Sequence, residues 1–261
     1  MKIVVCVKYV PDSSADQKFE SDLTVDRVAT PGLLSELDEY AVEQALQISE
    51  KAEGSEVIAL TVGPEGAAEA VRKALQMGAD SGVHVSDDAI AGSDALATSK
   101  VLAAAITKIG GVDLIVNGMA STDGGMSVVP AMLAERLDLP QLTFASKVEF
   151  QGNQFRAQRD GDSATEVLGG VTPIVLSVTD QSGEARYPSF KGIMAAKKKP
   201  LDTWSLGDLG VDAGEVGLGA AGTAVAAADA RPARTKGEIV TDEGGSGATA
   251  LVNFLASKKF I

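Results

Sequence analysis

From the start of the chain to about Leu139, short runs of β-branched residues alternate with segments whose apolar residues recur at helical spacing. Continuous apolar runs such as Val57–Val62 are typical of strands that are covered on both faces, as in a parallel sheet. The alternation therefore predicts a doubly wound α/β sheet, which binds ligands in the crevice outside the carboxyl ends of its strands. We expect strands at 2–9, 56–63, 82–86 and 113–118.

Three helices are expected between these strands. Ser35 resembles an N-terminal cap, and the apolar positions after it recur at helical spacing until Gly54. A second helix runs over 65–77 and ends at Gly78, and Ser93 could cap a third helix that reaches about Ile109.

The pattern changes after Pro140. Two β-rich runs, 143–151 and 154–159, flank Gly152–Asn153 and predict a hairpin, which is an antiparallel addition to the sheet. Further strands are expected at 165–168 and 173–178.

The last fifty residues have a different composition from the rest. Residues 212–247 are rich in glycine and alanine and hold too few large apolar residues for a core of their own. A short amphipathic helix follows over 248–260. We therefore divide the chain into an α/β domain, 1–211, and a C-terminal arm, 212–261, which either embraces a partner chain or packs on its own domain.

Composition excludes several classes of protein. The chain has one cysteine, Cys6, and one histidine, His84, which argues against disulfides, Cys/His zinc sites and Ser-His-Asp or Cys-His catalysis. Both residues lie in apolar strands, where a buried structural role is expected. No apolar run approaches the ~18 residues of a membrane span, and the N-terminus has no cleavable signal pattern. We expect a soluble protein in the bacterial cytoplasm, with no direct membrane insertion.

The best candidate for a ligand site is the run of small residues over 117–127, which leaves a predicted strand and enters a helix. Backbone N–H groups in such a turn can close on an anion at the helix N-terminus, so phosphate binding is expected. The run has no Gly-Lys-Ser/Thr for a Walker loop, and its glycines at 118, 124 and 125 do not fit the dinucleotide spacing. A structural loop without a ligand is the alternative. The strand ends at 6–10 and 62–64, and the cap region 35–38, would border the same crevice.

The segment 185–200 reverses the sign of the charge. It holds five basic residues and no acidic one within a chain of net charge −13, and apolar residues stand among the charges. Exposed apolar groups with a basic rim usually mark a contact surface. A pI near 4.5 repels phosphate at long range, so nucleic acid is not the expected partner.

Three acidic residues, Asp160, Asp162 and Glu166, are close in sequence. They could form a metal or acid/base site, but no histidine or second carboxylate cluster accompanies them. A solvated turn between strands is the favoured interpretation.

Taken together, these features resemble the beta subunit of electron transfer flavoproteins. The matching motifs occur in the family's order over nearly the whole chain and include Ile-Val-Val-Cys-Val-Lys8, Asp38-Glu-Tyr-Ala-Val-Glu43, Ala74-Leu-Gln-Met-Gly-Ala-Asp80, Gly118-Met-Ala-Ser-Thr-Asp-Gly124, Pro140-Gln-Leu-Thr-Phe-Ala-Ser146, Glu166-x-Leu168-x4-Pro173, Arg186-Tyr through Ile193-Met and Gly207-Asp-Leu-Gly-Val211. The resemblance implies a fold like that of the adenine nucleotide alpha hydrolases.

The resemblance also implies a function. Such a subunit forms a heterodimer with an alpha subunit that carries most contacts to FAD, while the beta subunit binds AMP in its crevice. Electrons arrive from flavin dehydrogenases, such as acyl-CoA dehydrogenases in fatty acid β-oxidation, and leave through a membrane quinone oxidoreductase toward the respiratory chain. The chain would then be an electron carrier subunit without catalytic activity of its own.

The family motifs also assign roles to residues. AMP contacts would fall on Cys6, Ser35, Glu36, Leu37, Asp38, Val62, Gly118, Met119, Ala120, Ser121, Thr122, Asp123, Gly124, Gly125, Met126, Ser127, Val128 and Val129. Docking of a dehydrogenase would use Arg186, Tyr187, Phe190, Lys191, Ile193, Met194, Lys197, Lys198 and Lys199, with Phe190 as the apolar anchor at a position where the family typically has leucine. Asp160 would hold the mobile flavin domain by pairing with a basic residue of the alpha subunit.

Three alternatives stay open. An electron-bifurcating member of the family would bind a second FAD in the crevice in place of AMP. An adenine-nucleotide hydrolase is built on a similar sheet, but such enzymes carry a Ser-Gly-Gly-x-Asp-Ser loop after the first strand, whereas similar residues stand here in another order at 121–127, after the fourth. A plain adenylate-binding module would use the same crevice but does not explain the basic segment.

Overall fold

The computed structural model describes residues 1–27, 29–229, 232–237, 239–242 and 244–261. The chain divides into two compact units, Met1–Ala226 and Ala227–Ile261. The predicted α/β architecture is confirmed in the first unit.

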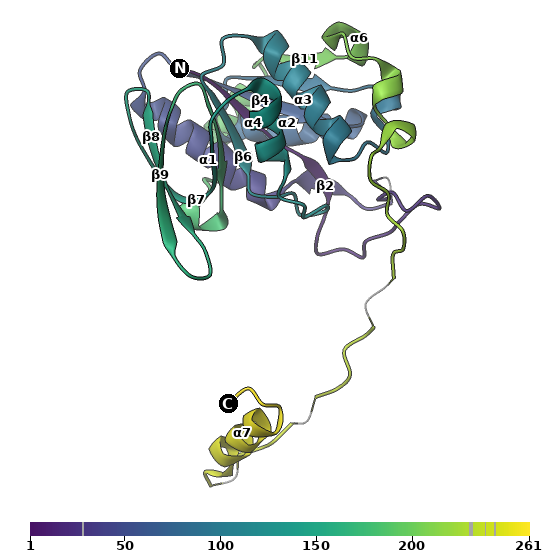
Figure 1. The fold of residues 1–261 in the computed structure, drawn as a ribbon, viewed down its shortest axis with the longest axis vertical. Coiled ribbons are helices and arrows are strands. Elements are labelled where there is room, and N and C mark those ends of the chain that lie inside the picture. The colour runs from purple at the N-terminus through teal and green to yellow at the C-terminus, as the bar shows by residue number, and fades with distance from the viewer. Residues whose placement is uncertain (28, 230–231, 238, 243) are drawn as a thin grey trace. The chain divides into compact units, whose positions relative to one another are not determined.

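A nine-stranded sheet forms the centre of the first unit, in the order β11-β5-β4-β1-β6-β10-β7-β8-β9 (Figure 1). The seven strands from β11 to β7 pair in parallel, and β7, β8 and β9 are antiparallel. The parallel strands are β1 (Lys2–Cys6), β4 (Glu56–Val62), β5 (Ser81–Val85), β6 (Leu114–Gly118), β7 (Gln141–Gln151), β10 (Ile174–Val178) and β11 (Leu201–Trp204). The antiparallel addition consists of β8 (Gln154–Asp160) and β9 (Thr165–Val171), and the hairpin turn at Gly152–Asn153 lies where the sequence predicts it.

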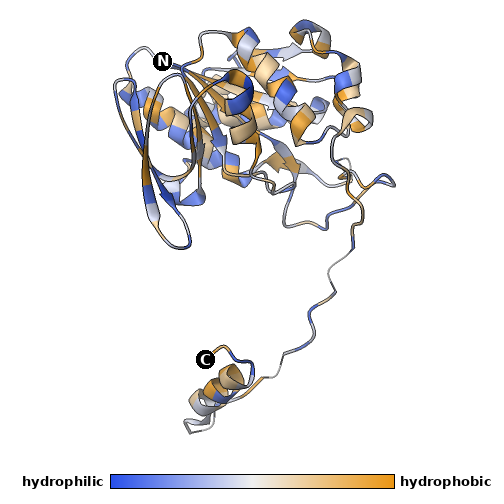
Figure 2. Ribbon diagram, viewed as in Figure 1, coloured by the Kyte–Doolittle hydropathy of each residue, from blue (hydrophilic) through white to orange (hydrophobic). Residues whose placement is uncertain are grey.

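The sheet is covered on both faces, as the continuous apolar strands require. Along β1, Ile3 and Val5 face one core with α1 (Glu36–Lys51) and α2 (Ala68–Met77), whereas Val4 and Cys6 face the other. The second core holds α3 (Ala95–Ile109), α4 (Val129–Leu137) and α6 (Leu206–Leu209). Figure 2 shows the hydrophobic residues concentrated in the central strands.

Several local features differ from the expectations. The first predicted strand is two elements, because the chain bends after Cys6 and β2 (Tyr9–Pro11) pairs with β3 (Gly32–Leu34) in a separate antiparallel sheet. The cap of α3 is Asp94, whose carboxylate accepts a hydrogen bond from the backbone N of Ala97, and not Ser93.

The basic segment contains a short helix, α5 (Phe190–Ala196), which packs on α2. In the second unit, α7 (Ser246–Ser257) corresponds to the predicted terminal helix. Residues 212–226, which the sequence assigns to the arm, lie in the first unit, where Val216 is buried.

Candidate functional site

A cavity of about 260 Å³ lies at the carboxyl ends of β1, β4 and β6. The strand order reverses at this place, because the chain leaves β1 toward β4 and β5 and later crosses to β6 on the other side. Such a switch point is where doubly wound sheets bind their ligands. The cavity brings together these predicted residues: Cys6, Asp38, Val62, Gly118, Met119, Ala120, Ser121, Gly124, Met126, Ser127 and Val129.

Other predicted residues lie beside the cavity without lining it. The hydroxyl of Ser35, which is fully buried, accepts a hydrogen bond from the backbone N of Thr122 at 3.3 Å and so joins the start of α1 to the loop after β6. Asp123 lies in the same loop. Glu36, Leu37, Gly125 and Val128 are also absent from the lining.

Sequence reasoning missed one wall of the cavity. Residues at the start of α3 line it because this helix packs on the opposite face of the sheet from α1, and only the expected cap near Ser93 hinted at this position. The lining residues that were not predicted are Ser93, Asp94, Ala95, Thr98, Leu102 and Pro130, whereas Val7, Lys8 and Asn117 lie in the predicted strand end and loop.

Asp123 is the centre of an ion cluster at the cavity edge. Its carboxylate oxygens lie 2.8 Å from Lys8 Nζ and 2.7 Å from Arg27 Nη2, and its side chain is 3% exposed. Burial alone would raise the pKa of Asp123, but the charge of Lys8 and the hydrogen bonds from both cations hold that pKa well below its usual range. The cluster ties the loop after β6 to the end of β1 and to the 12–31 segment.

Asp38 connects α1 to two strand ends. Its Oδ2 accepts a hydrogen bond from the backbone N of Lys8 at 2.8 Å, and the backbone of Gly118 also bonds to the carboxylate. Any Cβ at Gly118 would lie 2.5 Å from Asp38 Oδ1, so the close approach requires glycine. Burial raises the pKa of Asp38 to about 7, against the effect of these hydrogen bonds.

The cavity is better suited to binding than to covalent catalysis. Burial, and then the charge of Asp38, raise the pKa of the Cys6 thiol to about 12, so the thiol is protonated near neutral pH. Asp123 is engaged by two cations and is not free to act as a base. Among the residues that the structure describes, no three histidine, cysteine or acidic side chains are grouped as metal ligands.

The N-terminus of α4 opens on the cavity. Val129 and Pro130 belong to its first turn and line the cavity, and no side chain caps the helix there. Uncapped N–H groups at a helix N-terminus attract anions.

The predicted docking residues lie on and around α5. Tyr187 is 93% exposed and Phe190 81% exposed, and Ile193 and Met194 are also exposed. The lysines at 191, 197 and 198 are exposed beside them. Arg186 and Lys199 differ, because their side chains bond within the chain.

Asp160 is the last residue of β8, just before the turn to β9. Its carboxylate accepts hydrogen bonds from Ser146 Oγ at 2.5 Å, Thr165 Oγ1 at 2.7 Å and Gln158 Nε2 at 3.1 Å, and these bonds lower its pKa. Glu166 pairs instead with Arg159 at 2.8 Å. Asp160 is therefore charged and exposed, with neutral donors around it.

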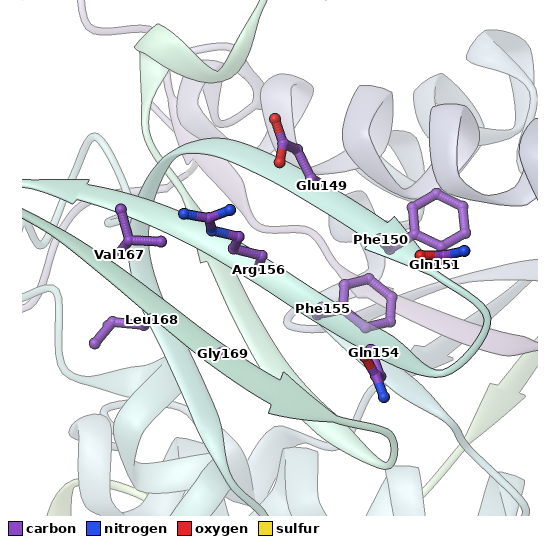
Figure 3. Close-up of a pocket in the computed structure, with 9 residues that line it drawn as sticks. All are labelled: Glu149, Phe150, Gln151, Gln154, Phe155, Arg156, Val167, Leu168 and Gly169. Carbon is purple, nitrogen blue, oxygen red and sulfur yellow. The ribbon is translucent and has the colours of Figure 1, made fainter.

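A larger hollow of about 650 Å³ lies on the antiparallel hairpin (Figure 3). Residues of β7, β8 and β9 line it, and the rings of Phe150 and Phe155 stack there with centroids 5.5 Å apart. It is remote in the strand order from the switch point between β1 and β6.

Comparisons with known proteins agree with the fold. The electron transfer flavoprotein domain model matches residues 22–209. The chain is 47% identical over 264 residues to the electron transfer flavoprotein subunit beta of Mycobacterium tuberculosis (strain ATCC 25618 / H37Rv), with 99% of each chain covered. It is 35% identical over 241 residues to the caffeyl-CoA reductase-Etf complex subunit CarD of Acetobacterium woodii, with 92% of each covered.

These relatives extend over nearly the full chain. No helix in the described ranges is both long enough and apolar enough to span a membrane. The confirmed doubly wound sheet, the family model and the relatives agree on one assignment. The chain belongs to the electron transfer flavoprotein beta subunit family.

Proposed function

We propose that this chain binds AMP in the cavity at the switch point, forms a heterodimer with an alpha subunit, and docks flavin dehydrogenases through the α5 surface. The exposed Phe190, with lysines around it on a chain of net charge −13, is the observation that carries this proposal. An aromatic group within a basic rim can anchor a transient complex while the charges orient an acidic partner.

The size of the cavity supports a mononucleotide. About 260 Å³ is near the lower end of the range of small-molecule sites. FAD contains an AMP moiety and a flavin half in addition, so it needs substantially more room than AMP. The uncapped start of α4 would bind the phosphate of AMP through backbone N–H groups.

The alpha subunit would contribute most contacts to FAD, which supplies the redox chemistry when it is bound. The role of this chain is to shape the heterodimer and select its partners. Asp160 would pair with a basic residue of the alpha subunit, which the lowered pKa and the exposure of its carboxylate support. Electrons would leave toward a membrane quinone oxidoreductase, and the protein would act in the bacterial cytoplasm.

The docking role is tested with the purified heterodimer and an acyl-CoA dehydrogenase supplied with its acyl-CoA substrate. Phe190→Ala should raise the KM for the heterodimer by about tenfold or more, since hot-spot truncations at interfaces cost ~2 kcal/mol. Phe190→Leu is the matched control and should keep most of the activity, because it retains an apolar anchor. An unchanged KM in Phe190→Ala, with FAD absorbance intact, would contradict the docking role.

The crevice ligand is tested by denaturing the pure heterodimer and identifying the released nucleotides by mass. We expect equal amounts of AMP and FAD. Two FAD and no AMP per heterodimer would instead establish the bifurcating alternative. ATP cleavage by the purified chain would favour the hydrolase alternative.

A further inference from the structure

The basic segment 185–200 is attached to the rest of the domain at its N-terminal end by Arg186. The guanidinium donates to both carboxylate oxygens of Glu43, from Nε at 2.6 Å and from Nη2 at 3.0 Å, and also to Glu50. The backbone N of Arg186 donates to the same Glu43 carboxylate at 3.1 Å. The side chain of Glu43, which belongs to α1, is only 6% exposed, and that of Arg186 is 34% exposed, so the carboxylate of the pair is shielded from solvent.

Both carboxylate oxygens of Glu43, the buried partner in this pair, accept hydrogen bonds within the chain. Glu43 also accepts a hydrogen bond from Gln47 at 2.8 Å. Burial alone would raise the pKa of Glu43, but the hydrogen bonds from Arg186 and Gln47 outweigh burial and lower that pKa. A bidentate pair fixes the direction of the guanidinium plane, which a single ammonium group cannot do.

Lys199 attaches the other end of the segment. Its ammonium group donates to the backbone carbonyls of Leu75, Gly78 and Ala79, at 3.0, 3.1 and 2.5 Å. Leu75 lies in the last turn of α2, Gly78 is its C-cap and Ala79 follows it, so the ammonium group sits at the helix C-terminus, where the helix dipole favours a positive charge. All three ammonium hydrogens of Lys199 are used within the chain.

The middle of the segment lies directly on α2. A Cβ at Gly192 would be 2.5 Å from the backbone oxygen of Gln76, so the two helix backbones approach closely only because position 192 is glycine. The hydroxyl of Ser189 caps α5 by accepting from the backbone N of Gly192 at 3.0 Å. With this side of α5 on α2, the exposed side presents Phe190, Lys191 and Met194, and the exposed Lys197 and Lys198 follow the helix.

We propose that Arg186 and Lys199 are positioning residues, which hold the docking helix in its binding orientation on α1 and α2 and do not themselves contact the dehydrogenase. The proposal rests on the proposed docking role of α5. Two of the five basic residues in the segment therefore act inside the chain, and Lys191, Lys197 and Lys198 form the charged rim. A helix that is ordered before the encounter loses less conformational freedom on docking.

Glu43 allows a sharp test, because it is buried and cannot reach a partner. If Arg186 acts by holding the segment, Glu43→Gln and Arg186→Gln should each raise the KM of the heterodimer for the acyl-CoA dehydrogenase reaction. We expect a rise of about tenfold in each, the scale set by ordering a few side chains. The rate at saturating heterodimer should not change, and the double variant should show no further loss.

Three further variants complete the set. Arg186→Lys keeps the charge but cannot form the bidentate pair with Glu43. Its KM should therefore be closer to that of Arg186→Gln than to that of the parent. Lys199→Gln should reproduce the effect from the other end of the segment. Glu53→Gln removes one exposed negative charge close to the end of α1 and is the matched control, with an unchanged KM.

Trypsin provides a readout that does not depend on docking. In the native heterodimer, cleavage after Lys191, Lys197 and Lys198 should be several-fold faster in the Arg186, Glu43 and Lys199 variants. Phe190→Ala should leave these cleavage rates unchanged. The Lys199–Pro200 bond is resistant in every variant because proline follows the lysine.

The outcomes distinguish the positioning role of Arg186 and Lys199 from the docking role of α5. A higher KM in Arg186→Gln with an unchanged KM and cleavage rate in Glu43→Gln would mean that Arg186 contacts the dehydrogenase directly, and the proposal would be wrong. It would also be wrong if Phe190→Ala raised the KM and none of the Arg186, Glu43 and Lys199 variants did. An unaffected KM in Phe190→Ala would instead overturn the docking role of α5.

Discussion

Asp38 makes the clearest prediction at the scale of a single residue. Its pKa of about 7 lies above the ordinary value of 3.8, so its protonated form is favoured in the folded chain. The stability that this gives is complete below about pH 4 and is lost as the pH rises through 7. From pH 5 to pH 8 the free energy of unfolding should fall by ~2.5 kcal/mol because of Asp38.

Asp38→Asn should remove this part of the pH dependence, whatever it does to stability at one pH. The measurement is the urea midpoint of parent and variant at pH 5 and pH 8. Asp123 does not interfere, because its lowered pKa affects stability only at more acidic pH. Parallel pH dependence in the two proteins would show that the carboxylate of Asp38 does not titrate in this range.

The sequence predicts the cavity residues that directly follow a strand. It does not predict residues that reach the cavity edge from segments without strand or helix periodicity. Cys6, Val62 and Gly118 could be placed because strand ends in a parallel sheet converge on one edge. Arg27 could not, because it reaches Asp123 from a segment without helical or strand periodicity. The intramolecular bonds of Arg186 and Lys199 were also beyond sequence reasoning, since they depend on how α5 packs on α2.

At the scale of elements, long periodic segments were predictable and short ones were not. The core strands and α1 to α3 follow the expected alternation. β11 and α5 were missed because four and seven residues carry too little periodicity, and α5 has a glycine in its middle. Tertiary packing on α2 stabilises this helix although its length and its glycine give it a low intrinsic helix propensity.

Gly192→Ala tests that conclusion. In an exposed helix this change would stabilise by up to ~1 kcal/mol. Here the new Cβ would collide with the Gln76 carbonyl oxygen, so α5 must move away from α2. We expect faster trypsin cleavage after Lys197 and a higher KM for the dehydrogenase reaction. Gly207→Ala in α6 is the matched control, because its Cβ meets nothing closer than 3.6 Å. Equal behaviour of the two variants would contradict the packing argument.

At the scale of the whole molecule, the second compact unit is the part whose role is hardest to predict from sequence. It joins residues 227–245 to a helix whose large side chains are exposed, with Leu251 at 58% and Phe254 at 49%. An apolar helix surface of this kind normally marks an interaction site. The prediction that this unit packs on the alpha subunit follows from the exposed side chains together with the family assignment.

Removal of residues 227–261 tests this prediction directly. The remaining unit contains both hydrophobic cores, so it should unfold at the temperature of the full chain. Its complex with the alpha subunit should weaken at least about tenfold. The truncated chain lacks several apolar side chains whose burial in the complex would contribute ~1.5 kcal/mol or more each. Phe254→Ser in the full chain should weaken the complex in the same direction, whereas Asn253→Ser should not. A lower unfolding temperature of the truncated chain with an unchanged affinity would show instead that the unit packs on its own domain.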